Sequence, residues 1–317
     1  FTLPYTNTSS YNMSQFIILV EDVSIFFLRE LEQIKARTFD VLYAPLASTR
    51  LIPVDSTTNP GAKTVTYSQY DSTGTAKIIA NYADDLPTAD TKGIQVTNNI
   101  VSIGNSFIIS LEDIRAARFA NKPLEQRKAN SAAQAHLQEM NKLAFFGSSS
   151  YGITGWLTNP SVDNNFVSGA NAAARLWSGK TPTQILADLN ESVTYIIDST
   201  NGVEYPNTIV MPIAQYQLIA NTQMAPGTDT TILQFFVRNN PLITIEWANE
   251  LKGSFSGGLD GFITYEKSIN KFWQEIPQVF EMFAPQYDNL AYKVPCHSKH
   301  GGTIIAYPQS QVFRRGI

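Results

Sequence analysis

The stretch from residue 62 to residue 82 limits the possible folds most, because it is rich in strand-forming residues and poor in apolar ones. Thr, Tyr and Ser dominate it, and Val65, Ile78 and Ile79 are among its few apolar side chains. The pattern predicts a hairpin with a first strand at 63–70, a turn at 71–74 and a return strand at 75–82. Because an isolated two-stranded hairpin is marginal in water, it must pack on its own domain or on a neighbouring subunit.

The rest of the chain shows both helical and strand periodicity, which predicts an α+β fold. Apolar residues at helical spacing predict helices at 20–36, at 111–121 with Ser110 as the cap, and at 123–146, 182–199 and 213–221. Strands are expected at 94–109, 207–212, 242–247, 261–265, 277–283 and 303–306. The helix over 123–146 would be roughly 35 Å long. The order of the segments indicates a second lobe that is inserted near residue 170.

The composition argues against a dedicated nucleic-acid binder and against a membrane protein. Charged residues make up only 16% of the 317 residues, and the formal net charge is −4. A nucleic-acid binder usually carries a basic patch, whereas no run of basic residues here exceeds two, as at Arg314-Arg315. No apolar run approaches the ~20 residues of a membrane span. A surface of neutral polar groups costs less to desolvate than a charged one, which suits a protein that is covered by neighbours.

The sequence contains no motif for catalysis. The Walker pattern is absent, and Phe255 occupies the middle of Gly253–Gly257, where a nucleophile elbow would require serine. His136 lies on a predicted helix and is interpreted as a packed or solvated side chain. We therefore expect no enzyme activity and no cofactor.

The best candidate for a metal site is Cys296-His297-x-x-His300, which contains the only cysteine of the chain. Structural metal sites usually need four ligands, and a fourth is not evident here. An exposed turn that leads into Gly301-Gly302 is the simpler interpretation. We therefore expect no metal site, and the single cysteine excludes an intrachain disulfide.

Three local patterns and their order carry a resemblance to a known family. The first is Pro-Gly-Ala-Lys-Thr-Val-Thr-Tyr at 60–67, and the second is Gly-Ile-Thr-Gly-Trp-Leu-Thr-Asn at 152–159. The third is Leu-Ala-Tyr-Lys-Val-Pro at 290–295, followed by Gly-Gly-Thr-Ile-Ile-Ala-Tyr-Pro at 301–308. With these patterns the chain resembles the Hong Kong 97-type major capsid proteins of tailed bacteriophages over nearly its whole length.

The resemblance implies an α+β capsid fold that is built from four parts. These are an N-terminal arm and helix (1–37), an extended E-loop hairpin (52–90), a P-domain with a long spine helix (38–51, 91–169 and 276–299) and an inserted A-domain (170–275 and 300–317). The spine helix would be the helix predicted over 123–146.

The function that the resemblance implies is that of a structural shell subunit. Copies of the chain would form the pentamers and hexamers of an icosahedral capsid that encloses double-stranded DNA without reading its sequence. The hairpin would contact adjacent subunits through Lys63, Val65, Tyr67, Tyr70, Lys77 and Ile79. Scaffolding, portal and decoration proteins would be further partners, and the virion would be assembled in the cytoplasm of a bacterial host.

Two other classes of function stay open at this point. An encapsulin-type nanocompartment shares the fold but stores enzymes, and an interior groove for a cargo peptide would distinguish it. A soluble enzyme or carbohydrate-binding α+β protein would need a convergent polar site, and the sequence contains none.

Overall fold

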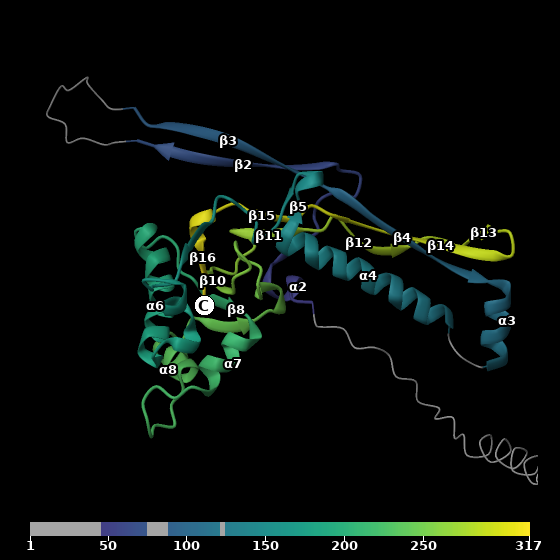
Figure 1. The fold of residues 1–317 in the computed structure, drawn as a ribbon. Helices are drawn as coiled ribbons and strands as arrows, with labels where there is room; N and C mark the ends of the chain where they lie inside the picture. The colour runs from purple at the N-terminus through teal and green to yellow at the C-terminus, as the bar shows by residue number, and fades with distance from the viewer. Residues whose placement is uncertain (1–45, 75–87, 121–123) are drawn as a thin grey trace, which may run out of the picture. The chain divides into compact units, whose positions relative to one another are not determined.

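The computed structural model describes residues 46–74, 88–120 and 124–317. The predicted arm and helix at 1–37 lie outside the described residues, as does the predicted return strand at 75–82. The described residues combine helices with five sheets, so the predicted α+β class is confirmed (Figure 1).

A five-stranded sheet forms the centre of one lobe. Its strands lie in the order β7 (Asp163–Phe166), β16 (Gln311–Arg315), β10 (Gly261–Tyr265), β8 (Thr208–Met211) and β9 (Thr244–Trp247). β10 runs antiparallel to both of its neighbours, whereas the outer pairs β7–β16 and β8–β9 are parallel. All four residues of β8 are buried, which confirms the strand predicted there.

Both faces of this sheet are buried, because successive side chains of a strand point to opposite sides. In β8, Ile209 and Met211 belong to one apolar cluster, and Val210 belongs to another. Phe262 and Ile263 of β10 divide between the two clusters in the same way. Full burial of one large apolar side chain contributes about 1.5–3 kcal/mol, so the sheet is stabilised from both sides.

Helices cover the cluster that contains Ile209 and Met211. They are α6 (Pro182–Ser199), α7 (Ile213–Asn221) and α8 (Ile232–Asn239), and the short helices α5 (Ala172–Arg175) and η2 (Trp177–Gly179) precede them. α6 begins with a capping box between Thr181 and Gln184, which fixes its first turn. The predictions for α6 and α7 are confirmed, whereas α8 was not predicted.

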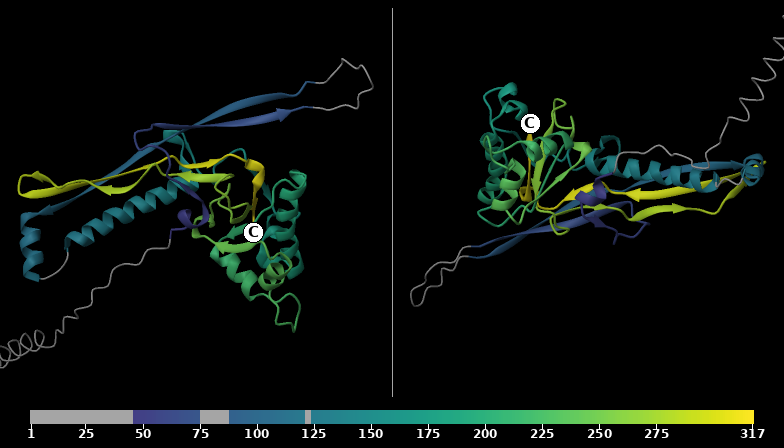
Figure 2. Two further views of the ribbon diagram at one scale, coloured as in Figure 1. Left: turned by 180° about the vertical axis from the view of Figure 1, so that it is seen from behind. Right: turned by 90° about the horizontal axis from the view of Figure 1, so that it is seen from below.

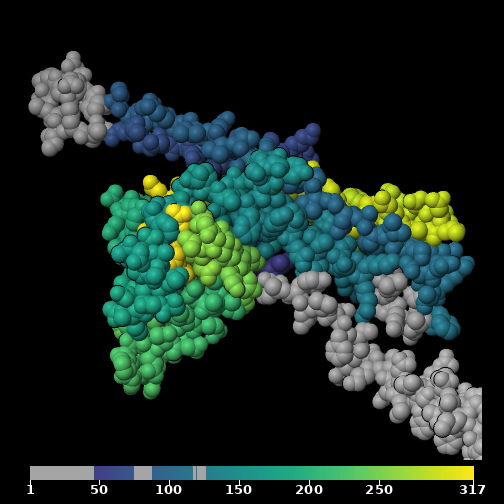
Figure 3. All heavy atoms as spheres, in the orientation of Figure 1, coloured from purple at the N-terminus to yellow at the C-terminus, as the bar shows by residue number. Residues whose placement is uncertain are grey.

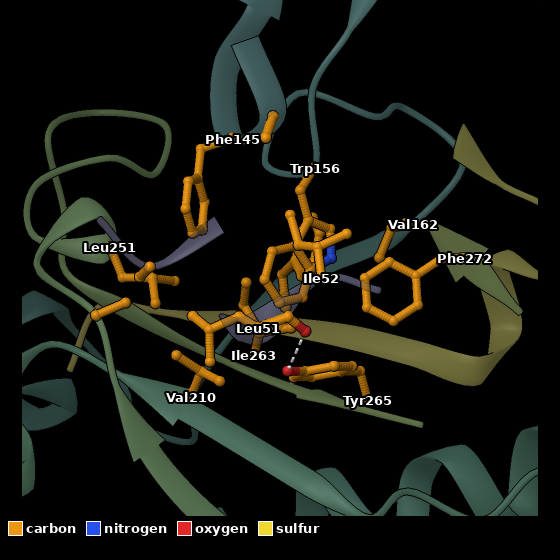
Figure 4. Packing of buried hydrophobic residues seen from close by; sticks show 14 of the residues in the cluster. Leu51, Ile52, Phe145, Trp156, Val162, Val210, Leu251, Ile263, Tyr265 and Phe272 are labelled. Carbon is orange, nitrogen blue, oxygen red and sulfur yellow. Dashed lines mark hydrogen bonds between the residues drawn. The ribbon is translucent and has the colours of Figure 1, made fainter. Parts of the chain in front are cut away.

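The other cluster joins segments that lie far apart in the sequence (Figure 4). It includes Leu51 of α2 (Ser48–Leu51), Trp156 and Tyr265. The rings of Trp156 and Tyr265 meet edge to face with centroids 4.9 Å apart. The hydroxyl of Tyr265 donates to the carbonyl of Leu51 at 2.9 Å, so a polar group is satisfied inside an apolar cluster.

The longest helix, α4 (Leu124–Phe146), lies beside a second sheet in both views of Figure 2. In that sheet β14 (Ala291–His300) pairs with β4 (Val101–Ser110) on one edge, and with β12 (Gln278–Met282) and β13 (Gln286–Asp288) on the other. α3 (Leu111–Ala120) follows β4, and the N–H of Asp113 donates to the hydroxyl of Ser110 at 3.0 Å. The long helix and the Ser110 cap are therefore both confirmed.

The C-terminal end of α4 is closed by the chain that follows it. Gly147 adopts a left-handed conformation with φ of 64°, which ends the helix. The N–H of Trp156 then donates to the carbonyl of Ala144 at 2.8 Å, which satisfies a carbonyl that the helix leaves free. A Cβ atom on Gly155 would lie 2.3 Å from the nitrogen of Gly147, so only glycine fits at this approach.

The remaining elements are short. β1 (Val54–Asp55), β11 (Phe272–Glu275) and β15 (Thr303–Ile305) form one small sheet, and β5 (Gly147–Ser148) and β6 (Ile153–Thr154) form another around η1 (Ser149–Tyr151). Two further helical turns are η3 (Asn249–Leu251) and η4 (Pro308–Ser310). Strand pairing crosses the predicted domain boundaries, since β7 falls in the predicted P-domain and pairs with β16 of the predicted A-domain. The four-part division stays a prediction.

Candidate intersubunit surface

β2 (Thr64–Thr73) and β3 (Asp90–Asn99) form an antiparallel hairpin that pairs Thr64 with Asn99 and Thr73 with Asp90. The predicted turn at 71–74 is wrong, because β2 continues through Thr73. The predicted strand at 94–109 is also two strands, since β3 belongs to the hairpin and β4 to the sheet beside α4. The last residues of β2 are polar and exposed, so their composition suits a turn as well as a solvated strand.

One face of the hairpin lies against its own chain. The ring of Tyr67 packs edge-on against Trp273 with centroids 5.9 Å apart, and its hydroxyl donates to the carbonyl of Ile305 at 3.5 Å. Burial raises the pKa of Tyr67. Gln69, two residues along the same face, donates to the carbonyl of Ala306. These contacts anchor the base of the hairpin to the sheet of β11 and β15.

The outer half of the hairpin is exposed on both faces. Tyr70 is 75% exposed, and its ring lies over Gly93 of the paired strand. Ile94, opposite Gln69, is 65% exposed. In the space-filling view the purple and blue atoms of the hairpin form a ridge at the top (Figure 3). Two large apolar side chains in solvent, on a ribbon without a core, are suited to contact with another chain.

The six predicted contact residues fall into three groups. Val65 and Tyr67 are half-buried on the face toward their own chain, Lys63 and Tyr70 are exposed, and Lys77 and Ile79 lie outside the described residues. An intersubunit role stays a prediction for all six.

A second exposed apolar surface lies around β13, between the end of β12 and the start of β14, and the sequence did not lead us to expect it. Every residue from 281 to 290 is exposed, including Phe283, Tyr287 and Leu290. Tyr287 pairs with Tyr292 across the strands, with ring centroids 5.3 Å apart. The density of aromatic residues in this short stretch could have predicted an interaction site, since exposed apolar patches of this kind mark such sites.

Comparison with known protein families gives a match over most of the chain. The sequence model of a family described as major capsid protein matches residues 74–317. The chain belongs to this family. No curated protein matches the sequence.

Solved structures show the same fold for this capsid protein. The capsid of Myoviridae phage XM1 has a TM-score of 0.77 at 17% identity, and the match covers 91% of this chain and 98% of that one. For Mycobacterium phage Adephagia the TM-score is 0.60 at 14% identity, with 93% and 96% covered. The capsid of a native GTA particle gives 0.61 at 10% identity, with 89% and 94% covered.

The family and fold of the capsid protein are those of a structural protein and not of an enzyme. Copies of it assemble into the multi-subunit shell of a virion. The comparisons do not favour the encapsulin-type alternative. Within the described ranges, no helix is long and apolar enough to cross a membrane.

The exposed turn predicted at Cys296–His300 is wrong, because these residues lie in β14 of the capsid protein. Cys296 and His300 are buried on the strand face that carries Ser298. His297 lies on the opposite face, where its Nδ1 atom is 3.0 Å from the side-chain oxygen of Gln278. The three side chains therefore cannot converge on one ion. In the part of the chain that the structure describes, no group of three His, Cys, Asp or Glu residues could hold a metal.

Two buried histidines form hydrogen bonds at the sheet that contains β14. His136 of α4 bonds Ser298 through Nδ1 at 2.7 Å and Asn105 through Nε2 at 3.0 Å, and burial lowers its pKa. His300 accepts the N–H of Gly302 at 2.9 Å, and burial lowers its pKa to about 4. Both are therefore neutral near pH 7, and the interpretation of His136 as a packed side chain is confirmed.

Proposed function

We propose that this capsid protein forms an icosahedral, tailed-phage-type shell from pentamers and hexamers that encloses double-stranded DNA. The net charge of −4 and the lack of a long basic run support enclosure without tight or sequence-specific DNA binding. Scaffolding, portal and decoration proteins and assembly in the cytoplasm of a bacterial host belong to the same proposal. So does the four-part division into arm, E-loop, P-domain and A-domain.

The β2–β3 hairpin is the proposed tie between adjacent subunits. The observation that carries this is the difference between its two halves. Tyr67 and Gln69 at the base bond to their own chain, whereas Tyr70, the next residue outward, is exposed. An adjacent copy would bury the Tyr70 side chain, which would then contribute about 1.5–3 kcal/mol. Lys63, Lys77 and Ile79 are proposed contact residues on the strength of the resemblance alone.

The test is a chain in which a short Gly-Ser linker replaces residues 70–93. This change removes the outer half of the hairpin and retains the base pairs from Thr64 opposite Asn99 to Gln69 opposite Ile94. We expect the shortened subunit to keep its far-ultraviolet circular dichroism and its unfolding midpoint. It should fail to form closed shells in electron micrographs.

The control is the full chain, expressed and imaged under the same conditions. Normal closed shells from the shortened chain would refute the hairpin as an essential tie. Unfolding of the shortened subunit would mean that the outer half supports its own chain, which also contradicts the proposal.

A further inference from the structure

Two arginines stack on one phenylalanine at the edge of the five-stranded sheet. Phe166 is the last residue of β7 and lies opposite Arg315 of β16 in the parallel register. The guanidinium carbon of Arg315 is 4.3 Å from the centroid of the Phe166 ring. That of Arg175, at the end of α5, is 4.1 Å from the same ring. Two positive charges are therefore held at one aromatic side chain.

Neither cation has a carboxylate partner among the described residues. Arg314, the neighbour of Arg315 in β16, shows the contrast. It is buried, pairs with Glu191 at 3.0 Å and Asp163 at 3.3 Å, and its charge is thereby compensated. Arg315 points to the other face of the strand, and its Nε atom is buried without an acceptor. The Nε of Arg175 reaches only the carbonyl of Gly169, at 3.3 Å.

This arrangement is unfavourable in an isolated subunit and favourable around an added anion. Two like charges near one ring repel each other, and this repulsion opposes the attraction of each cation to the ring. A carboxylate bound beside this pair would compensate their charge, and a guanidinium group offers it charge-assisted hydrogen bonds. The surroundings are partly apolar, since Phe166 and Leu176 are 40% and 43% exposed. A contact here would therefore bury apolar area as well.

We propose that Arg175 and Arg315 form a carboxylate-binding contact for a second copy of the chain. The inference rests on self-assembly of the capsid protein into a shell. In a ring of subunits each contact is heterologous, so a basic site on one copy must meet a different surface of the next. Between residues 163 and 265, two exposed carboxylates, Asp198 and Asp229, make no hydrogen bond or ion pair with other described residues. We assign the carboxylate to one of these two, because they lie in the same part of the chain as the five-stranded sheet that carries the arginines.

The experiment measures the lowest subunit concentration at which closed shells form, by light scattering and electron microscopy. The full-length variants are Arg175→Gln and Arg315→Gln. Arg238→Gln is the matched control, because Arg238 also stacks on a ring, that of Phe235, but within its own helix α8. The unfolding midpoint of each unassembled subunit is measured in parallel, so that a folding defect is separated from an assembly defect.

We expect each of the two variants to raise the threshold about tenfold, which corresponds to about 1.4 kcal/mol. The control should leave it unchanged. Lysine at either position should raise the threshold less than glutamine does. It keeps the positive charge but lacks the planar set of hydrogen-bond donors of the guanidinium group. The difference in threshold between the arginine variants and the unaltered chain should shrink at about 1 M salt, where the Debye length falls to about 3 Å. One of Asp198→Asn and Asp229→Asn should raise the threshold to the same extent.

Several results would overturn the inference. These are an unchanged threshold for both arginine variants, a rise no larger than that of Arg238→Gln, a rise explained by a lower unfolding midpoint, or no effect of either aspartate variant. Shells that close normally but retain less DNA would assign the arginines to nucleic acid instead. If the unaltered chain formed no shells at all, the proposed function would fail. If shells formed equally well with and without the arginines, this inference alone would fail.

Discussion

Replacing Gly155 with alanine should destabilise the capsid subunit, because the added methyl group has no space. Its Cβ atom would lie 2.3 Å from the nitrogen of Gly147, 2.4 Å from the carbonyl carbon of Phe146 and 2.6 Å from the carbonyl oxygen of Phe145. All three are main-chain atoms at the end of α4, so they cannot turn aside as a flexible side chain would. A contact of ordinary length requires the two segments to separate by about 1 Å.

The expected loss of unfolding free energy follows from the contacts that this separation disturbs. Overpacking of this kind typically costs about 1–3 kcal/mol. The bond from the N–H of Trp156 to the carbonyl of Ala144, now 2.8 Å, would lengthen and cost about 1 kcal/mol more. We therefore expect a loss of about 3 kcal/mol. At about 2 °C per kcal/mol for a chain of this size, that is a decrease of roughly 6 °C in Tm.

The assay is urea and thermal unfolding of the unassembled subunit, followed by circular dichroism and tryptophan fluorescence. Gly104→Ala is the matched control, because Gly104 lies on the exposed face of β4 and its nearest heavy atom would be 3.7 Å from the new Cβ. A Gly155→Ala subunit within about 0.5 kcal/mol of the unaltered one, the range of neutral surface changes, would refute the reasoning.

Three other perturbations separate the roles of individual residues. Burial lowers the pKa of His300 to about 4 from 6.5, so folding favours its neutral form. The contribution of neutral His300 to the free energy of unfolding is complete above pH 6.5. About 3 kcal/mol of that free energy is lost as the pH falls to 4. Unfolding midpoints measured over this range should therefore fall less steeply for His300→Gln, and an equally steep fall would contradict the assignment. Tyr67→Ser should lower the Tm of the unassembled subunit by a few degrees because it removes packing on the chain's own sheet, whereas Tyr70→Ser should leave Tm unchanged and impair assembly. Equal Tm shifts in calorimetry would show that the two faces of the hairpin do not differ. EDTA should leave the Tm unchanged because Cys296 and His297 lie on opposite faces of β14, and a decrease that zinc reverses would disprove this.

The elements that the sequence predicts well are those with local boundaries. α6 and α7 begin and end at the predicted residues, and β10 matches the predicted strand at 261–265. Each combines a clear apolar period with a capping or turn residue at its ends. α8 is only eight residues long and was missed, although the capping box of Thr231 with Gln234 marks its start. β16 was missed because Val312 and Phe313 are flanked by polar residues whose burial only the folded chain reveals.

The hairpin was harder to predict because its strands alternate between apolar and polar residues over only part of their length, as at Val65 and Tyr67 of β2. The face pattern of a strand is readable only when one side is buried, and most of β2 is exposed. Its true partner, β3, begins beyond the predicted return strand. The anchoring contacts of Tyr67 and Gln69 involve residues 273 to 306, more than 200 positions away. No local pattern contains that information, so the sequence could identify contact candidates but not which of them face their own chain.

The place of β16 in the five-stranded sheet constrains the order of events during synthesis. β16 lies between β7 and β10, and within the described residues β7 pairs with no other strand. The segment at 163–166 therefore leaves the ribosome long before its partner at 311–315 exists. The sheet cannot be completed, nor Arg314 enclosed between Asp163 and Glu191, until those last strand residues have been added. Chains still being translated thus lack a finished lobe, so native contacts made by this lobe can form only after synthesis has passed β16.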